Sequence, residues 1–204
     1  MVVETLRGVL ESDYRGPRAV FTQVHVLKAL MAIGSSGGVG RGRLGALTGL
    51  GQGEVRTLIK RLKDNQLIVI ETDGCKLSKK GEKEYEKISS QLVWSGPVDA
   101  RTLELGGRCW AVLVRGAEAP VRYGIEQRDA AIKAGADGAF TSVFKGGRFI
   151  IPGEGTDCEK SGPTEPWMTV RKAGPRDGDA VIVTGSARES DSEDGALAAA
   201  LTLL

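Results

Sequence analysis

The strongest constraint on the fold lies in residues 52–77, where a helical pattern passes directly into a hairpin pattern. Apolar side chains recur three and four positions apart in residues 52–65: Val55, Leu58, Ile59 and Leu62. This spacing predicts a helix that buries one face. Residues 67–72 are rich in β-branched side chains, and Asp73-Gly74 forms a strong two-residue turn signal. We therefore expect a helix followed by a two-stranded hairpin.

Three further helices are expected around this segment. Residues 20–33 and 41–48 carry their own helical patterns, and a glycine-rich stretch separates them. Residues 79–91 follow the hairpin, with Ser78 placed to cap a helix. Three helices, a hairpin and another helix form the order of a winged helix-turn-helix. With a short amphipathic helix over residues 1–10, we expect this domain to span residues 1–94.

The second half of the chain has a mixed pattern, which predicts a small α/β domain over residues 95–204. Ser95-Gly96-Pro97 marks the expected boundary. Strands are expected at 109–114, 139–144, 148–151 and 179–184, and helices at 125–134 and 194–204. The predicted fold class is therefore α+β, with an N-terminal winged helix-turn-helix followed by a small α/β domain that has a mixed sheet.

The first domain resembles a known group of DNA-binding proteins. Residues 40–67, together with the closing Leu77-Ser-Lys-Lys-Gly-Glu82, look like prokaryotic winged-helix repressors, including the DNA-binding end of central glycolytic gene regulators. The resemblance covers about 70 residues, which is the length of one winged-helix domain. It implies the fold and a role in binding duplex DNA.

A second resemblance covers nearly the whole chain. Residues 124–139 and the segment Asp177-Gly-Asp-Ala-Val-Ile-Val-Thr184 are similar to an uncharacterised archaeal family. Its members join a winged helix to a C-terminal α/β module of unknown function. The resemblance implies a transcriptional regulator of this architecture and supplies no ligand.

Candidate DNA contacts follow from the winged-helix arrangement, in which the third helix enters the major groove. Arginine can contact guanine, glutamine can read adenine, and basic side chains near the helix can contact phosphates. The candidates are Arg41, Arg43, Gln52, Arg56, Thr57, Lys60, Arg61 and Lys76. Residues 1–92 hold 15 Lys/Arg against 10 Asp/Glu, whereas residues 93–204 hold 13 against 16. The basic half is therefore the expected partner of a polyanion.

Catalytic and metal sites are not expected. His25 is the single histidine, and Cys75, Cys109 and Cys158 are too far apart in sequence for a Cys-x-x-Cys metal motif. The G-x-G-x-x-G match at residues 40–45 follows a predicted helix rather than a strand, so it does not indicate a dinucleotide site. We expect no enzyme activity, catalytic residue, metal or cofactor.

Two other functions remain as alternatives. A winged helix can serve as a protein-protein interaction module instead of binding DNA. Residues 177–185 also look slightly like part of ATP-using aminoimidazole-ribonucleotide-synthetase-like enzymes. That likeness allows a small nucleotide- or phosphate-binding enzyme in the second domain.

The second domain is expected to sense a ligand, to mediate dimerisation, or both. Predicted helix starts with nearby glycine favour anions. They suggest a site for a small anionic effector at Arg122, Gly124, Arg128, Gly185 and Ser186. A homodimer is expected, joined through the apolar faces of residues 1–10 or 79–91. The chain has neither a signal-peptide pattern nor an apolar run long enough to span a membrane, so we expect a cytoplasmic protein with no membrane partner.

Overall fold

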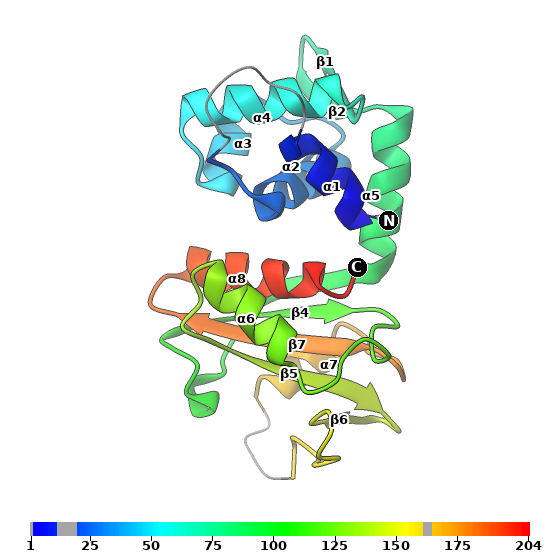
Figure 1. Cartoon of the computed structure of the whole chain (residues 1–204), viewed down its shortest axis with the longest axis vertical. Coiled ribbons are helices and arrows are strands. Elements are labelled where there is room, and N and C mark those ends of the chain that lie inside the picture. The colour runs from blue at the N-terminus through cyan, green and yellow to red at the C-terminus, as the bar shows by residue number, and fades with distance from the viewer. Residues whose placement is uncertain (1, 12–19, 161–164) are drawn as a thin grey trace. The chain divides into compact units, whose positions relative to one another are not determined.

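The computed structural model describes residues 2–11, 20–160 and 165–204 of the chain (Figure 1). By internal packing the chain divides into two compact units, Met1–Ser89 and Ser90–Leu204. We call them the N-terminal unit and the C-terminal unit. The fold class is α+β, as predicted: a largely helical first part precedes a second part built on a sheet.

The N-terminal unit packs its helices around one apolar core. Its elements are α1 (Val2–Glu11), α2 (Gln23–Ser36), α3 (Arg41–Thr48), α4 (Gln52–Asp64), β1 (Ile68–Glu71), β2 (Gly74–Leu77) and α5 (Lys79–Gln91). Leu27 and Leu30 of α2, Leu44 of α3, and Leu58 and Leu62 of α4 are fully buried. The apolar spacing that predicts these helices therefore marks the side chains that hold them together.

The hairpin and α5 are fixed to the helices by close backbone contact. β1 and β2 pair antiparallel, with Ile68 opposite Leu77. A Cβ atom placed on Gly81 of α5 would lie 1.9 Å from the carbonyl oxygen of Leu67, so any larger residue there would force the two segments apart. Val39, which precedes α3, exchanges backbone hydrogen bonds with Cys75 of β2. The position of the hairpin beside α3 and α4 is therefore set by the backbone.

The apolar faces suggested for dimerisation are used inside the N-terminal unit. Val2, Leu6 and Val9 of α1 are buried. On α5, Ile88 is buried, and the ring of Tyr85 packs on Gly34. Part of the apolar surface suggested for dimerisation is therefore used inside the chain, while Val3 and Leu10 of α1 are half-buried. The homodimer itself stays a prediction.

The C-terminal unit contains a five-stranded sheet in the order β3-β4-β7-β5-β6. The strands are β3 (Leu92–Val98), β4 (Arg108–Val114), β5 (Gly138–Lys145), β6 (Arg148–Ile150) and β7 (Ala180–Ser186). Every neighbouring pair is antiparallel, so the prediction of a mixed sheet is wrong. β4 and β5 do run in the same direction, but β7 lies between them and is antiparallel to both.

Helices cover this sheet on one face. Figure 1 shows α6 (Ile125–Lys133) and α8 (Glu189–Leu201) together over β4, β7 and β5. The other face carries a cluster of buried apolar side chains that includes Phe149, Val181, and Trp167 of the short helix α7 (Trp167–Arg171). In this cluster the rings of Phe149 and Trp167 stack with their centroids 4.9 Å apart. A further short helix, η1 (Arg101–Leu103), follows β3 in the chain.

The boundary signal in the sequence lies inside β3. Ser95, Gly96 and Pro97 are part of this strand and pair with β4. Because β3 is at the edge of the sheet, its outer backbone groups need no strand partner, and a proline is tolerated there. The two compact units divide several residues earlier, at Ser89 and Ser90.

Candidate nucleic-acid interface

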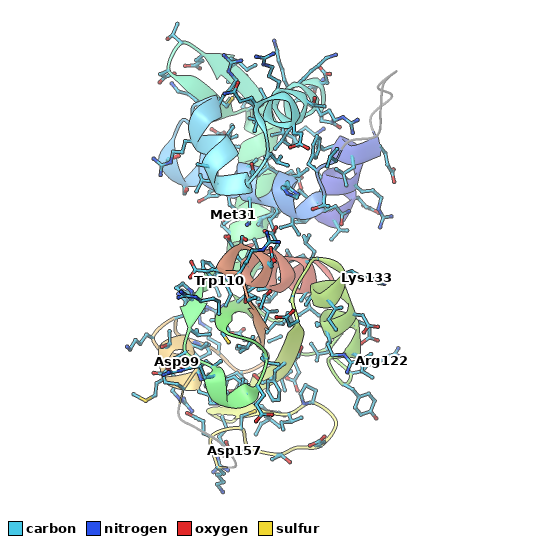
Figure 2. The ribbon with its side chains drawn as sticks, turned by 90° about the vertical axis from the view of Figure 1, so that its left-hand side faces the viewer. Met31, Asp99, Trp110, Arg122, Lys133 and Asp157 are labelled. Carbon is cyan, nitrogen blue, oxygen red and sulfur yellow. The ribbon has the colours of Figure 1, made fainter. Side chains whose placement is uncertain are left out.

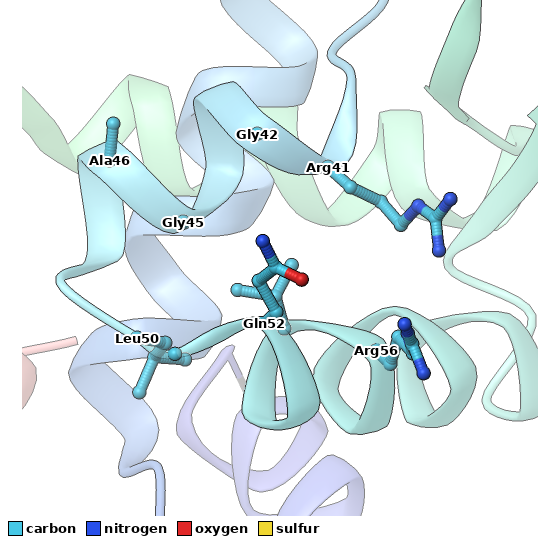
Figure 3. Close-up of a pocket in the computed structure, with 9 residues that line it drawn as sticks. Arg41, Gly42, Gly45, Ala46, Leu50, Gln52 and Arg56 are labelled. Carbon is cyan, nitrogen blue, oxygen red and sulfur yellow. The ribbon is translucent and has the colours of Figure 1, made fainter.

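The first part of the candidate interface is a cavity between α3 and α4 (Figure 3). It has a volume of about 490 Å³ and is lined by Arg41 of α3 and by Gln52 and Arg56 of α4, among others. Figure 3 shows the Gln52 amide projecting toward α3 and the guanidinium groups of Arg41 and Arg56 at one end of the cavity. All three side chains are exposed. They can therefore reach a ligand without any rearrangement of the core.

A second cavity, of about 650 Å³, lies between α4 and the hairpin. Arg41 and Arg56 line it as well, so the two cavities share one basic edge. Lys60 and Lys63 extend this edge along α4, and Ile59 contributes apolar lining. The result is a surface with positive charge along one side of α4 and an apolar base beneath it.

Three exposed basic side chains of α4 and the amide of Gln52 follow one helical stripe. Gln52, Arg56, Lys60 and Lys63 are four, four and three positions apart, and all four are exposed. Residues at this spacing lie above one another on a helix surface. We call these four residues the α4 stripe. Lys63 is absent from the sequence-based candidates, although the same spacing could have identified it.

Arg61 lies off this stripe, and the prediction that it contacts DNA is wrong. It is 4% exposed, and its Nη1 donates hydrogen bonds to the carbonyl oxygens of Val9, at 3.3 Å, and Leu10, at 2.5 Å. Its guanidinium carbon also lies 5.5 Å from the centroid of the Phe21 ring. A positive group at the C-terminal end of α1 complements the partial negative charge of the helix. Arg61 therefore ties α4 to α1.

The start of α4 already holds a negative charge. Glu54 Oε2 accepts a hydrogen bond from the backbone N–H of Gly51 at 2.8 Å. This carboxylate lies beside the positive end of the helix and competes with a phosphate for it. The exposed α4 stripe carries the other candidate contacts of α4.

The other candidates on the helices differ in their surroundings. Arg43 of α3 is exposed but lines neither cavity. Thr57 is half-buried, and its hydroxyl donates to the carbonyl oxygen of Gly53 at 3.0 Å. Thr57 therefore uses its proton within α4 and retains only an acceptor for a partner.

Lys76, the candidate on the hairpin, is engaged by two carboxylates. Its Nζ lies 2.8 Å from Glu71 Oε2 and 3.0 Å from Asp73 Oδ2. These contacts raise the pKa of Lys76, with the Glu71 hydrogen bond as the main cause, and the Lys76 hydrogen bond lowers the pKa of Asp73. Lys76 and Asp73 are therefore both charged at neutral pH. The sequence identified Lys76 but not the acids that compensate its charge.

The anion site suggested for the C-terminal unit does not form as one cluster. Gly124 caps the start of α6 and packs against Thr141, whereas Ser186 Oγ is 3.4 Å from the carbonyl oxygen of Gly135, beyond the other end of α6. Gly124 and Gly135 are eleven positions apart in sequence, which corresponds to roughly 16 Å along a helix. Figure 2 shows Arg122 and Lys133 toward opposite ends of this helix. Arg122, Gly124 and Arg128 therefore lie apart from Gly185 and Ser186.

The surroundings of the second group also disfavour an anion. Gly185 packs against the backbone of Leu105, and Ser186 is buried. The first turn of α8 carries Glu189 and Asp191, and Asp191 pairs with Arg188. These carboxylates already occupy the positive end of the helix. Near the other group, Arg128 is 3.8 Å from Asp129.

His25 and the three cysteines have structural surroundings. His25 Nδ1 lies 3.0 Å from the backbone nitrogen of Thr22 and belongs to the capping box of α2. Cys75, Cys109 and Cys158 are buried free thiols. Burial, with a smaller contribution from Asp157, raises the pKa of Cys158 to about 12. In the described part of the chain, no three His, Cys, Asp or Glu side chains are grouped so that they could hold a metal ion.

Comparisons with known proteins identify relatives without a stated function. Residues 105–203 match a family described as a domain of unknown function, DUF4443. The chain is also similar to the solved structure of the hypothetical protein PH0730 from Pyrococcus horikoshii OT3, with 26% identity and a TM-score of 0.72 over 90% of this chain and 92% of that one. No curated protein matches the chain. The relatives thus include an uncharacterised archaeal protein.

Across residues 2–11, 20–160 and 165–204, no helix combines the length and apolar character needed to cross a membrane.

Proposed function

We propose that the N-terminal unit is a winged helix-turn-helix domain that binds duplex DNA through the α4 stripe. The observation that carries this proposal is the alignment of Gln52, Arg56, Lys60 and Lys63 on one exposed face of α4, with Arg41 across the groove. A helix presented in this way fits the major groove, where arginine and glutamine can read base edges and lysine can contact phosphates.

The order of elements supports the same proposal. α2, α3 and α4 are followed by the β1-β2 hairpin, which is the order of a winged helix, and α3 joins α4 through a short turn at Gly49. In this arrangement α4 is the recognition helix and the hairpin is the wing. Because α4 is anchored on the core through Leu58 and Leu62, its outer face can meet DNA as a rigid body.

A second candidate function is protein recognition by the hairpin. Val69 and Ile70 on β1 are 41% and 53% exposed, and Ile70 lines the cavity beside α4. Exposed apolar side chains at a cleft favour a protein partner. The two functions differ in their response to salt, because DNA binding releases counterions and weakens steeply as salt rises.

For the whole chain we propose a transcriptional regulator that acts as a homodimer. A single winged helix reads a short site, and pairing two on symmetric half-sites raises affinity and specificity. The C-terminal unit would supply the dimer contact, bind an anionic effector, or both. The first test is retention on heparin, followed by a gel shift with DNA from upstream of the protein's own gene. Retention and a salt-sensitive shift are expected, whereas failure in both would contradict the proposal.

A further inference from the structure

We infer that Glu71 and Asp73, at the tip of the hairpin, act as negative determinants that weaken the binding of polyanions to the cavity between α4 and the hairpin, which we call the α4 groove. We call this pair the wing acids. The inference rests on the proposed function of the N-terminal unit and goes beyond it. It assigns to this wing the opposite electrostatic role from that of α4.

The wing acids share a cavity with the basic stripe. Glu71 and Asp73 line the same cavity as Arg56, Lys60 and Lys63. A DNA strand that follows the basic edge of α4 therefore brings its phosphates beside two carboxylates. Like charges in such proximity repel.

The hairpin cannot neutralise these acids completely. Residues 68–77 contain Glu71, Asp73 and a single base, Lys76. Lys76 Nζ contacts both acids, at 2.8 and 3.0 Å, so its positive charge is shared between them. The hairpin consequently carries a net charge of −1 when all three groups are ionised. A phosphate that recruited Lys76 would also leave the two carboxylates without their counter-ion.

The exposure of these groups limits the size of the effect. The side chains of Glu71 and Asp73 are 50% and 62% exposed, so water and salt screen their interaction with DNA. A moderate change in affinity is therefore expected when both charges are removed. Because the effect is electrostatic, it should shrink as salt rises.

The test compares the double variant Glu71→Gln/Asp73→Asn with wild type and with Glu82→Gln/Glu86→Gln. Glu82 and Glu86 are exposed on α5 and line neither cavity of the interface, so this control makes the same change in net charge elsewhere. Affinity for a fluorescently labelled random-sequence duplex is measured by anisotropy at about 0.05 M salt. Circular dichroism melting establishes that the three proteins are equally folded.

The wing variant is expected to bind the duplex roughly 3- to 10-fold more tightly than wild type, and the control variant less than about 2-fold more tightly. A gain no larger than that of the control would overturn the inference. Absence of salt-sensitive duplex binding by all three proteins would instead contradict the proposed function. In that case elution from heparin tests the electrostatic effect of the wing acids without DNA. Later elution of the wing variant than of the control supports the inference, and equal elution overturns it.

Discussion

Lys76 Nζ lies 2.8 Å from Glu71 Oε2, so the one base of the hairpin is held by an acid of the same hairpin. A second acid, Asp73, contacts the same ammonium group at 3.0 Å. The hairpin therefore offers little free positive charge to DNA. The proposed DNA binding would therefore depend mainly on α3 and α4, where Arg41, Arg56 and Lys60 are exposed.

Replacement of Lys76 by alanine tests this division of charge. Arg56→Ala is expected to reduce the slope of log affinity against log salt by about 0.9, the value for one phosphate contact. Lys76→Ala is expected to change the slope by less than half as much, because its charge is already compensated. Anisotropy titrations over a salt series measure both slopes. Equal changes would show that Lys76 contacts a phosphate directly.

The neighbouring residues Lys60 and Arg61 are expected to have separable roles. Arg61→Ala removes hydrogen bonds from a buried cation to the end of α1 and should cost about 2 kcal/mol of stability. Lys60→Ala, on the exposed stripe, should change stability by less than about 0.5 kcal/mol and weaken DNA binding. Circular dichroism melting measures the stability of both. A destabilised Lys60 variant beside an unaffected Arg61 variant would contradict the assignment.

In the C-terminal unit, Asp179 is expected to be critical for stability. Its buried carboxylate accepts hydrogen bonds from Arg115 Nη1 at 2.5 Å, from Gly116 N at 3.0 Å and from Arg176 N at 2.7 Å. Asp179→Asn should cost about 3 kcal/mol, because the partly buried Arg115 loses its charged partner and an amide replaces a buried oxygen that accepts backbone hydrogen bonds. The exposed Asp137→Asn is a matched control and should cost less than about 0.5 kcal/mol.

Tryptophan fluorescence is a suitable probe for this comparison. All three tryptophans, Trp94, Trp110 and Trp167, lie in the C-terminal unit, so their signal follows the unfolding of that unit. Denaturant titrations of the two variants give the difference in stability. An Asp179 variant as stable as its control would show that these hydrogen bonds contribute little.

The buried thiols predict a loss of stability at high pH. Burial raises the pKa of Cys158 from its ordinary value of 9.0 to about 12. A pKa raised in the folded state adds stability that is complete below about 9 and is lost as pH rises toward 12. Unfolding titrations of wild type and Cys158→Ala between about pH 8 and 11 should diverge in this direction, with wild type losing more stability at the alkaline end. Parallel curves would exclude Cys158 as the cause.

Thiol labelling provides an independent check at lower pH. The pKa values of Cys75 and Cys109 are also raised by burial, so all three thiols are protonated near neutral pH. The native protein is expected to resist alkylation at about pH 8, below the ordinary thiol pKa of 9.0. Denaturation should expose all three cysteines. Rapid labelling of the native protein would contradict their burial.

The sequence predicted the N-terminal unit better than the residues that line its surface. Helical spacing and the Asp73-Gly74 turn are local signals, and they located α4 and the hairpin closely. The role of Arg61 depends on α1, which is about 50 positions away in sequence, so local pattern could not reveal it. Helical spacing from Arg56 does, however, place Arg61 off the stripe and Lys63 on it.

The sheet of the C-terminal unit was harder to predict because its pairings are distant in sequence. Local pattern predicted four of the five strands and missed β3, where Ser95-Gly96-Pro97 indicated a boundary instead. The pairing has no such local signal: Val112 of β4 pairs with Ile182 of β7, which in turn pairs with Thr141 of β5. Such insertion of a late strand between two earlier ones leaves no local signal. The same long-range arrangement separates Gly124 from Ser186 and explains why two helix starts did not form one site.

The most direct test of the account compares Arg56→Ala/Lys60→Ala with Lys79→Ala/Lys83→Ala. Both double variants lose two exposed positive charges from the N-terminal unit, the first pair from the α4 stripe and the second from α5. Affinity for duplex DNA from upstream of the protein's own gene is measured by anisotropy across a salt series. The α4 variant is expected to bind more weakly, with a log–log slope reduced by roughly 2, while the α5 variant keeps a slope close to that of wild type. Equal slopes and affinities for the two variants would contradict DNA binding through α4.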